Sequence, residues 1–349
     1  MRDIIDSISE EVNSYLEKES TEVVPLDDVG AETRTISKDD FKEIRLHHTK
    51  TESTFIDGGI ASIISAPSIS VDFIRLASVT YNTHGYMAPF KREYFCLSKI
   101  VEESDNLFYM SKLIPCDDSG EPHIRKIRID DGSLRDGNNI GSMSRFLSMV
   151  LRFEELDFAK IVASRSSRKS LLVLDGSLIC SYDGEDNLMN SLSYICQEKD
   201  ILLQGIPKTN SLFTDSGQDI VMTLRKLEKD SGFRDKMWFN GPLLTSKEGS
   251  YMSDVYYAKL HKAAKNIFRV EFDAASSMID YHKVMGTLAS LSGDPVFLGY
   301  PYPLIKVDQF ARVTNNEKSQ LRARFLNKVK IDDIESSSNS HNILDNIMF

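Results

Sequence analysis

Cysteine is scarce in this sequence, with four residues in 349, and no two of them form a Cys-x-x-Cys pair. Their wide spacing argues against both a structural zinc site and a disulfide framework. We therefore expect Cys96, Cys116, Cys180 and Cys196 to be ordinary reduced thiols. The seven histidines are scattered as well, so the sequence does not indicate a zinc hydrolase.

Long apolar runs are also missing. No stretch approaches the roughly 18 uninterrupted apolar residues that span a bilayer. The first twenty residues are acidic and amphipathic, unlike a signal peptide. We therefore expect a cytoplasmic protein that does not enter a membrane.

Positive charge is in deficit, since 42 Lys and Arg residues against 52 Asp and Glu give a formal net charge of −10. Passive nucleic-acid binding usually requires a basic surface, so such binding would depend here on local clusters. Three basic clusters occur, within residues 165–169, 259–265 and 318–324. Each is equally compatible with a solvated helix or loop face.

Several catalytic motifs are absent too. The sequence has no G-x-x-x-x-G-K-[ST] loop, no G-x-G-x-x-G after a predicted strand, and no recognisable serine, cysteine or histidine triad. An ATPase, a dehydrogenase and a triad hydrolase are therefore not indicated.

The chain is 41% hydrophobic and 27% charged, which is ordinary globular composition. Apolar spacing predicts a β-rich first third after an opening helix, then alternating helices and strands, and hence an α/β fold. We expect an N-terminal helical extension (1–50), a main domain (51–325) and a mobile C-terminal tail (326–349). The predicted helices are 4–17, 143–162, 186–198, 254–265 and 277–291, and the predicted strands are 54–64 (strand, glycine turn, strand), 69–73, 93–98, 107–114, 171–174, 201–206 and 267–272.

The segment 171–206 reads as a β-α-β unit, whose two strands should run parallel. Parallel strands place their carboxyl ends at one edge of a sheet, where open α/β folds bind ligands. Asp175 follows the first of these strands and Lys208 follows the second. We therefore expect the two side chains to lie close together.

Two aspartates follow buried apolar runs and precede glycine, Asp57 in FIDGG and Asp175 in VLDGS. Two-metal phosphoryl chemistry needs carboxylates held rigidly around the cations, and adjacent glycines allow a phosphate backbone to approach. The alternative interpretation is a pair of ordinary Asp-Gly turns. Each motif alone is also compatible with that interpretation.

A third carboxylate is expected on the helix predicted from residue 143. Glu155 interrupts the apolar stripe of this helix, and a glutamate in that position is rarely buried without a partner such as a metal. The neighbouring Glu154 competes for the role. Either glutamate could also border the stripe and reach solvent.

Further candidates lie near the predicted sheet edge. Lys208 could place its ammonium beside a phosphate, or could be a simple loop lysine. Tyr300 and Tyr302 are held by adjacent prolines and lead into a helix that contains Asp308 and Arg312. Such a rigid aromatic pair suggests either a stacking platform or chain packing.

Taken in order, four signatures resemble those of the NurA nuclease family. They are FIDGG with Asp57, RFEELDFA with Glu155, LLVLDGSL with Asp175 followed by GIPKTNS with Lys208, and the closing GYPYPLIKVDQFARV, together spanning about residues 54 to 314. The resemblance implies an RNase H-like core, with a mixed central sheet flanked by helices, a β-rich insertion and terminal helical extensions. It also implies a homodimer that works with a hexameric HerA ATPase.

The activity that the resemblance implies is cleavage of single- and double-stranded DNA with Mn²⁺, or Mg²⁺, as the metal. It would be a 5′–3′ exonuclease and single-strand endonuclease that processes DNA ends in recombinational repair. The metal would be bound by Asp57, Glu155 and Asp175, with Tyr300 and Asp308 near the site. The family pattern usually has histidine at the last position, so Asp308 is a departure. A non-catalytic subunit that binds HerA or DNA, and cleavage of RNA, are the alternatives.

Overall fold

The computed structural model describes residues 2–18, 20–25, 30–47, 52–82, 85–117, 120–135, 137, 139–208, 212–248, 251–275, 280–326 and 328. The predicted C-terminal tail lies almost entirely outside these residues. The chain divides into two compact units. The first comprises Met1–Ser53, Ser167–Cys180 and Cys196–Pro303, and the second comprises Thr54–Ser166, Ser181–Ile195 and Leu304–Phe349.

The first unit contains a mixed sheet with strand order β2-β13-β14-β15-β11-β10, in which β3 also pairs with β13, and a separate β1-β12 pair. Its elements are α1 (Arg2–Glu17), β1 (Val23–Pro25), β2 (Glu32–Thr33), η1 (Lys38–Asp40), β3 (Lys42–Glu43), β10 (Leu171–Leu174), β11 (Leu202–Gly205), β12 (Leu212–Thr214), α4 (Ile220–Asp230), β13 (Trp238–Glu248), β14 (Tyr251–Lys259), β15 (Phe268–Asp273), α5 (Tyr281–Ser290) and η3 (Pro295–Phe297).

The parallel pair predicted around Asp175 is present. β10 and β11 pair in parallel, with Leu171 opposite Leu202 and Leu174 opposite Gly205. All four residues of β10 are buried, as expected of a short apolar strand covered on both faces. The other strand pairs of this sheet are antiparallel, so the sheet is mixed, as predicted.

The helix predicted over residues 254–265 is wrong, because residues 251–259 form strand β14. This strand pairs with β13 on one side and β15 on the other. Val255, Tyr256 and Tyr257 are buried there, and β-branched and aromatic side chains of this kind favour strands. Pairing with two neighbouring strands therefore outweighed the helical spacing of the apolar residues in this segment.

One predicted basic cluster changes with this correction. Lys259 ends β14 and is buried, and its ammonium pairs with the carboxylate of Glu228. The same carboxylate accepts a hydrogen bond from the indole N–H of Trp238 at 3.1 Å. Lys259 therefore neutralises a buried charge and is not part of a solvated basic face.

The second unit contains a sheet with strand order β4-β5-β7-β8-β9, and β6 pairs with β5. Successive strands from β5 to β9 are antiparallel, which confirms a β-rich first third. The elements of this unit are β4 (Ser53–Ala66), β5 (Ile69–Asn82), β6 (Gly85–Tyr86), β7 (Phe90–Glu103), β8 (Asn106–Pro115), β9 (His123–Arg128), η2 (Gly132–Leu134), α2 (Met143–Arg165), α3 (Glu185–Glu198), α6 (Tyr302–Ala311) and α7 (Asn315–Leu326).

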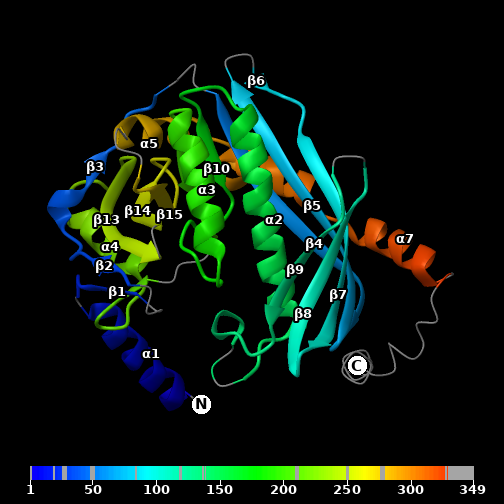
Figure 1. Cartoon of the computed structure of the whole chain (residues 1–349). Coiled ribbons are helices and arrows are strands. Elements are labelled where there is room, and N and C mark those ends of the chain that lie inside the picture. Colours follow the sequence, from blue (N-terminus) through cyan, green and yellow to red (C-terminus); the bar gives the residue numbers. More distant parts are fainter. Residues whose placement is uncertain are drawn as a thin grey trace. The chain divides into compact units, whose positions relative to one another are not determined.

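Helix α2 is the long predicted helix, and it packs against β5 and β8 of the same unit (Figure 1). Its N-terminus is capped by Ser142, whose hydroxyl accepts a hydrogen bond from the N–H of Arg145. Phe146, Val150, Leu156 and Phe158 are among its buried residues. The cap and these buried contacts fix the position of α2, and hence of the polar side chains that it carries.

The glycine turn predicted in FIDGG is absent. Residues 53–66 form one continuous strand, β4, and Asp57 lies within it. A Cβ atom on Gly58 would lie 2.5 Å from Oε1 of Glu155, and one on Gly59 would lie 2.4 Å from the carbonyl oxygen of Ala311. The glycines therefore allow α2 and α6 to approach the strand closely, rather than allowing it to turn.

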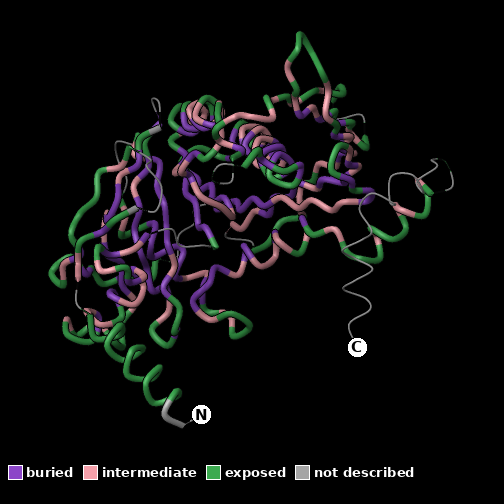
Figure 2. The backbone as a smooth tube through the Cα atoms, turned by 90° about the horizontal axis from the view of Figure 1, so that it is seen from below, coloured by how far each residue is buried: buried purple, intermediate pink, exposed green. Residues whose placement is uncertain are grey.

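The opening helix is present as α1, and Figure 2 colours the backbone that follows the N-terminus as exposed. Its apolar residues Ile4, Ile5, Ile8 and Val12 are among those exposed residues. Its last turn contacts the rest of the first unit, because the hydroxyl of Tyr15 donates a hydrogen bond to the carbonyl of Gly217 at 2.9 Å. Among the described residues, no helix is long and apolar enough to cross a membrane. The fold as described is mixed α/β, with helices on the sheets, as the sequence predicts.

Candidate metal carboxylates

In the first unit, Asp175 lies directly beyond the carboxyl end of β10. Its side chain is almost fully buried, and the Nζ atom of Lys208 lies 2.9 Å from its Oδ2 atom. This proximity is the one that the parallel pairing predicts. A buried carboxylate requires a neighbouring positive charge, and the largely exposed ammonium of Lys208 supplies it here.

Tyr300 approaches the same carboxylate. Its hydroxyl lies 3.4 Å from Oδ1 of Asp175, the long end of hydrogen-bond distance. Its ring packs against Phe268 and Phe297, with centroids 5.2 Å and 5.1 Å away. Packing therefore fixes the ring while the hydroxyl reaches Asp175, and the stacking interpretation stays a prediction. Tyr302 instead begins α6.

Glu271 is a residue near this site that the sequence reasoning missed. It is fully buried on β15, and its carboxylate accepts hydrogen bonds from Ser177 Oγ at 3.0 Å and from the backbone N–H of Leu178. Arg269 Nε lies 2.8 Å from the same carboxylate. Glu271 therefore fixes the loop that follows Asp175. The available signal was a glutamate within the apolar strand FRVEF.

We expect Ser177→Ala to lower the free energy of unfolding by about 1–3 kcal/mol, because it removes a hydrogen bond to a buried carboxylate. Urea unfolding followed by circular dichroism measures this. Ser191→Ala is the matched control, since that exposed hydroxyl, among the described residues, bonds to a carbonyl of its own helix. Equal stability of the Ser177→Ala and Ser191→Ala variants would contradict a clamping role for Glu271.

In the second unit, Glu155 lies beside the strand that carries Asp57. The carboxylate of Glu155 packs over Gly58, and Oδ1 of Asp57 accepts a hydrogen bond from the N–H of Gly58 at 2.9 Å. Glu155 therefore reaches the residue next to Asp57 because glycine leaves space for it. A larger residue at position 58 would displace this carboxylate.

A partly buried guanidinium supports Glu155. Arg152 lies one helical turn earlier on α2, with Nη1 4.0 Å from Oε2 of Glu155, and its Nε donates to Glu185 at 2.7 Å. Glu185 in turn accepts hydrogen bonds from the backbone N–H groups of Ser181 and Tyr182. This network restricts the side chain of Arg152 and hence the position of its charge next to Glu155.

Asp308 lies on helix α6 of the second unit. The end of this helix lies against β4, since Ala311 contacts Gly59. The carboxylate of Asp308 pairs with Arg312 at 2.8 Å, a partly exposed i, i+4 pair. Asp308 therefore supplies a carboxylate where the resemblance would place a histidine.

Glu154 and Glu155 have different partners. Glu154 is buried, and its Oε1 atom lies 2.9 Å from both His123 Nε2 and Arg125 Nε. The hydrogen bond that the His123 imidazole donates to the Glu154 carboxylate raises the pKa of His123 above its usual value. Glu154 therefore holds β9 against α2, whereas Glu155 faces β4.

The structure thus gathers the candidate residues in two groups. The first unit brings Lys208 and Tyr300 to Asp175, and the second unit brings Glu155 to the strand of Asp57, with α6 against the same strand.

Comparisons with known proteins add little to these observations. No protein-family model matches the sequence, and no curated protein matches it. Among solved structures, human endonuclease V has a TM-score of 0.36 and 11% identity, with 81% of this chain and 94% of that chain covered. An endonuclease V of Ciona intestinalis, bound to a 24-mer DNA that contains an inosine followed by a ribo-adenosine, has a TM-score of 0.36 and 10% identity, with 90% and 99% covered. Likeness at this level carries no argument about this chain.

Proposed function

We propose that this protein is a metal-dependent nuclease of the NurA type, which cleaves DNA phosphodiesters with Mn²⁺ or Mg²⁺. The observation that carries the proposal is the buried carboxylate of Asp175, held at the end of a parallel strand between an ammonium and a tyrosine hydroxyl. Asp57 lies on a strand whose next residue, Gly58, leaves space for the carboxylate of Glu155 from α2. Carboxylates of this kind are costly to bury without a function that uses them.

The resemblance implies that the two groups of residues serve one metal. We propose, on that basis, that Asp57, Glu155 and Asp175 hold the metal, with Asp308 near the site.

The donor set fits a hard divalent cation. All four side chains offer carboxylate oxygens, the ligands that Mg²⁺ and Mn²⁺ prefer, and no thiol or imidazole is among them. A cation held there would polarise the phosphate and lower the pKa of bound water. Asp57, Glu155 and Asp175 would hold the cation. The ammonium of Lys208 would offset negative charge that develops on the phosphate, and Tyr300 would orient Asp175.

Purified full-length protein should degrade end-labelled linear DNA when Mn²⁺ is added, and should be inactive with EDTA. The same assay should include Mg²⁺, single-stranded and double-stranded DNA, and RNA of matched sequence. Cleavage of RNA but not of DNA would indicate that the protein is a ribonuclease. Absence of cleavage of every substrate with both metals would contradict the proposed function.

A non-catalytic subunit is the second candidate, and Asp308 is the observation that favours it, because a carboxylate cannot donate as an imidazolium does. The buried Asp175 with Lys208 opposes it. We further propose a homodimer that works with a HerA-type ATPase, because a chain of net charge −10 is poorly suited to load DNA unaided. Co-elution of the two purified proteins in size-exclusion chromatography tests this partnership.

A further inference from the structure

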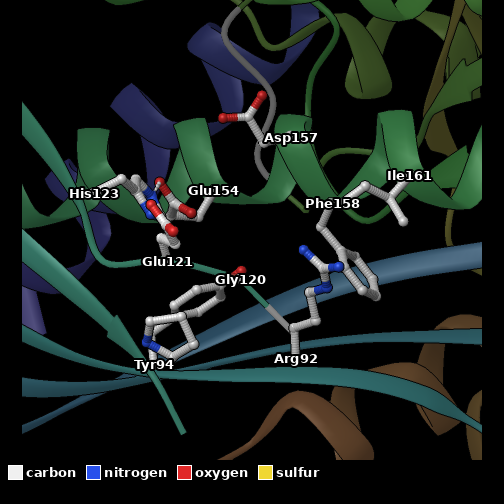
Figure 3. A pocket seen from close by; sticks show the side chains of 10 residues that line it. Arg92, Tyr94, Gly120, Glu121, His123, Glu154, Asp157, Phe158 and Ile161 are labelled. Carbon is white, nitrogen blue, oxygen red and sulfur yellow. Dashed lines mark hydrogen bonds and ion pairs between the residues drawn. The ribbon is translucent and has the colours of Figure 1, made fainter. Parts of the chain in front are cut away.

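The second unit contains a pocket of about 210 Å³ between α2, the strands β7 and β8, and the residues that lead into β9. Figure 3 shows Glu121 and Glu154 beside His123 at one end, and Arg92 beside Phe158 at the other. The pocket therefore has a hydrogen-bond-accepting end and a guanidinium end. Its lining residues are Arg92, Tyr94, Pro115, Gly120, Glu121, His123, Glu154, Asp157, Phe158 and Ile161.

The hydrogen-bond-accepting end of the pocket has carboxylate oxygens that can accept hydrogen bonds from a ligand. The side chain of Glu154 is only 3% exposed, and both of its hydrogen bonds, from His123 and Arg125, end on Oε1. Its second oxygen, Oε2, accepts no hydrogen bond from the described residues. Glu121 is exposed at the rim, and among the described residues its carboxylate makes no hydrogen bond or ion pair. Two carboxylates can therefore accept from donors that enter the pocket.

The remaining walls suit a flat, partly apolar ligand. Pro115, Phe158 and Ile161 contribute apolar surface, and Tyr94 contributes an aromatic ring. Phe158 is fixed by stacking on Phe90, with centroids 5.3 Å apart. Unpaired bases are recognised in such pockets by aromatic or apolar contact with their faces and by hydrogen bonds to their edges.

We propose that this pocket binds a single unpaired guanine base of the nucleic-acid substrate. Guanine carries two neighbouring donors, N1–H and the N2 amino group, and an acceptor, O6, on one edge. The donors match the carboxylates of Glu154 and Glu121, and O6 matches the guanidinium of Arg92. Adenine and cytosine each present one amino donor beside an acceptor, and so would leave one carboxylate without a donor.

The location of the pocket favours a nucleotide over another small ligand, and this step rests on the proposed function. Glu154 and Glu155 are consecutive on α2, and consecutive helical residues point about 100° apart. The pocket and the proposed metal carboxylate therefore occupy adjacent faces of one helix, within the reach of one nucleotide. Guanine binding would place a phosphate of its strand near Glu155.

Isothermal titration calorimetry of the metal-free, full-length protein with GMP and AMP tests the base preference, because the two probes share the same sugar and phosphate. We expect GMP to bind at least about tenfold more tightly than AMP. Arg92→Met and Glu121→Gln should each reduce that ratio towards one. Glu121→Gln changes an exposed side chain, so it tests the pocket even if Arg92→Met fails to fold. Arg168→Met, at an exposed ion pair with Asp200, is the matched control.

Mapping of cut positions on end-labelled single-stranded DNA separates this inference from the proposed function. A guanine bias that disappears in Glu121→Gln but persists in Arg168→Met would support the pocket. GMP selectivity in a protein that cleaves nothing would support the pocket and contradict the nuclease proposal. Equal affinity for GMP and AMP in the wild-type protein would overturn the inference, whether or not DNA is cleaved.

Discussion

Replacement of Asp175 by alanine is expected to reduce Mn²⁺-dependent DNA cleavage by roughly 10³-fold or more, because the proposed cation loses a buried carboxylate ligand. Asp57→Ala should have an effect of the same size. Initial rates of cleavage of end-labelled linear DNA measure both. Asp6→Ala, on the exposed face of α1, is the control and should cleave as the wild type does.

Metal binding distinguishes a shared site from two separate ones. If Asp57 and Asp175 hold the same cation, either single substitution should remove the Mn²⁺ site seen in a calorimetric titration, and the double substitution should add nothing further. Additive losses would indicate separate sites. Cleavage retained at the wild-type rate in a folded Asp175→Ala variant would refute the assignment of this residue.

Replacement of Asp72 by asparagine is expected to stabilise the protein at neutral pH by about 2–3 kcal/mol. Asp72 lies fully buried on β5, and burial raises its pKa from 3.8 to about 6, even though Ser62 donates a hydrogen bond to its carboxylate. A difference of about two pKa units corresponds to about 3 kcal/mol between the two protonation states. Above that pKa the folded protein must keep a buried carboxylate charged.

The sign of the pH dependence follows from this shift. The folded state holds a proton on Asp72 over a pH range in which the unfolded chain has released it, so this contribution to stability is complete below about pH 4 and is lost as the pH rises through about 6. Urea unfolding between pH 4 and 7.5 measures it. The decrease should be smaller in Asp72→Asn, and an Asp40→Asn control, at an exposed position, should follow the wild type. Identical pH profiles for all three proteins would contradict the prediction.

Some of the candidate site could be predicted because it depends on local pattern and on one rule of topology. The apolar run LLVL followed by aspartate predicts a buried strand with a carboxylate at its end, and the β-α-β unit predicts that Lys208 lies nearby. Both predictions were confirmed. The role of these residues in metal binding stays a prediction.

The failures share a cause. FIDGG reads locally as a turn, but its glycines allow α2 and α6 to approach a continuous strand. Residues 254–265 have helical spacing, but strands on both sides hold 251–259 extended. Glu271 could not be assigned from FRVEF, because its partners Ser177 and Leu178 lie more than 90 residues away in the chain.

The sequence by itself determined the α/β class, the parallel strand pair and the set of candidate carboxylates, since these follow from hydrophobic periodicity and from the residue types at strand ends. Only the tertiary structure decided which glutamate faces which strand. Glu154 and Glu155 are adjacent and chemically identical, yet one meets His123 and Arg125 while the other packs over Gly58. That difference depends on what lies across each face of α2, and periodicity along one helix does not encode it.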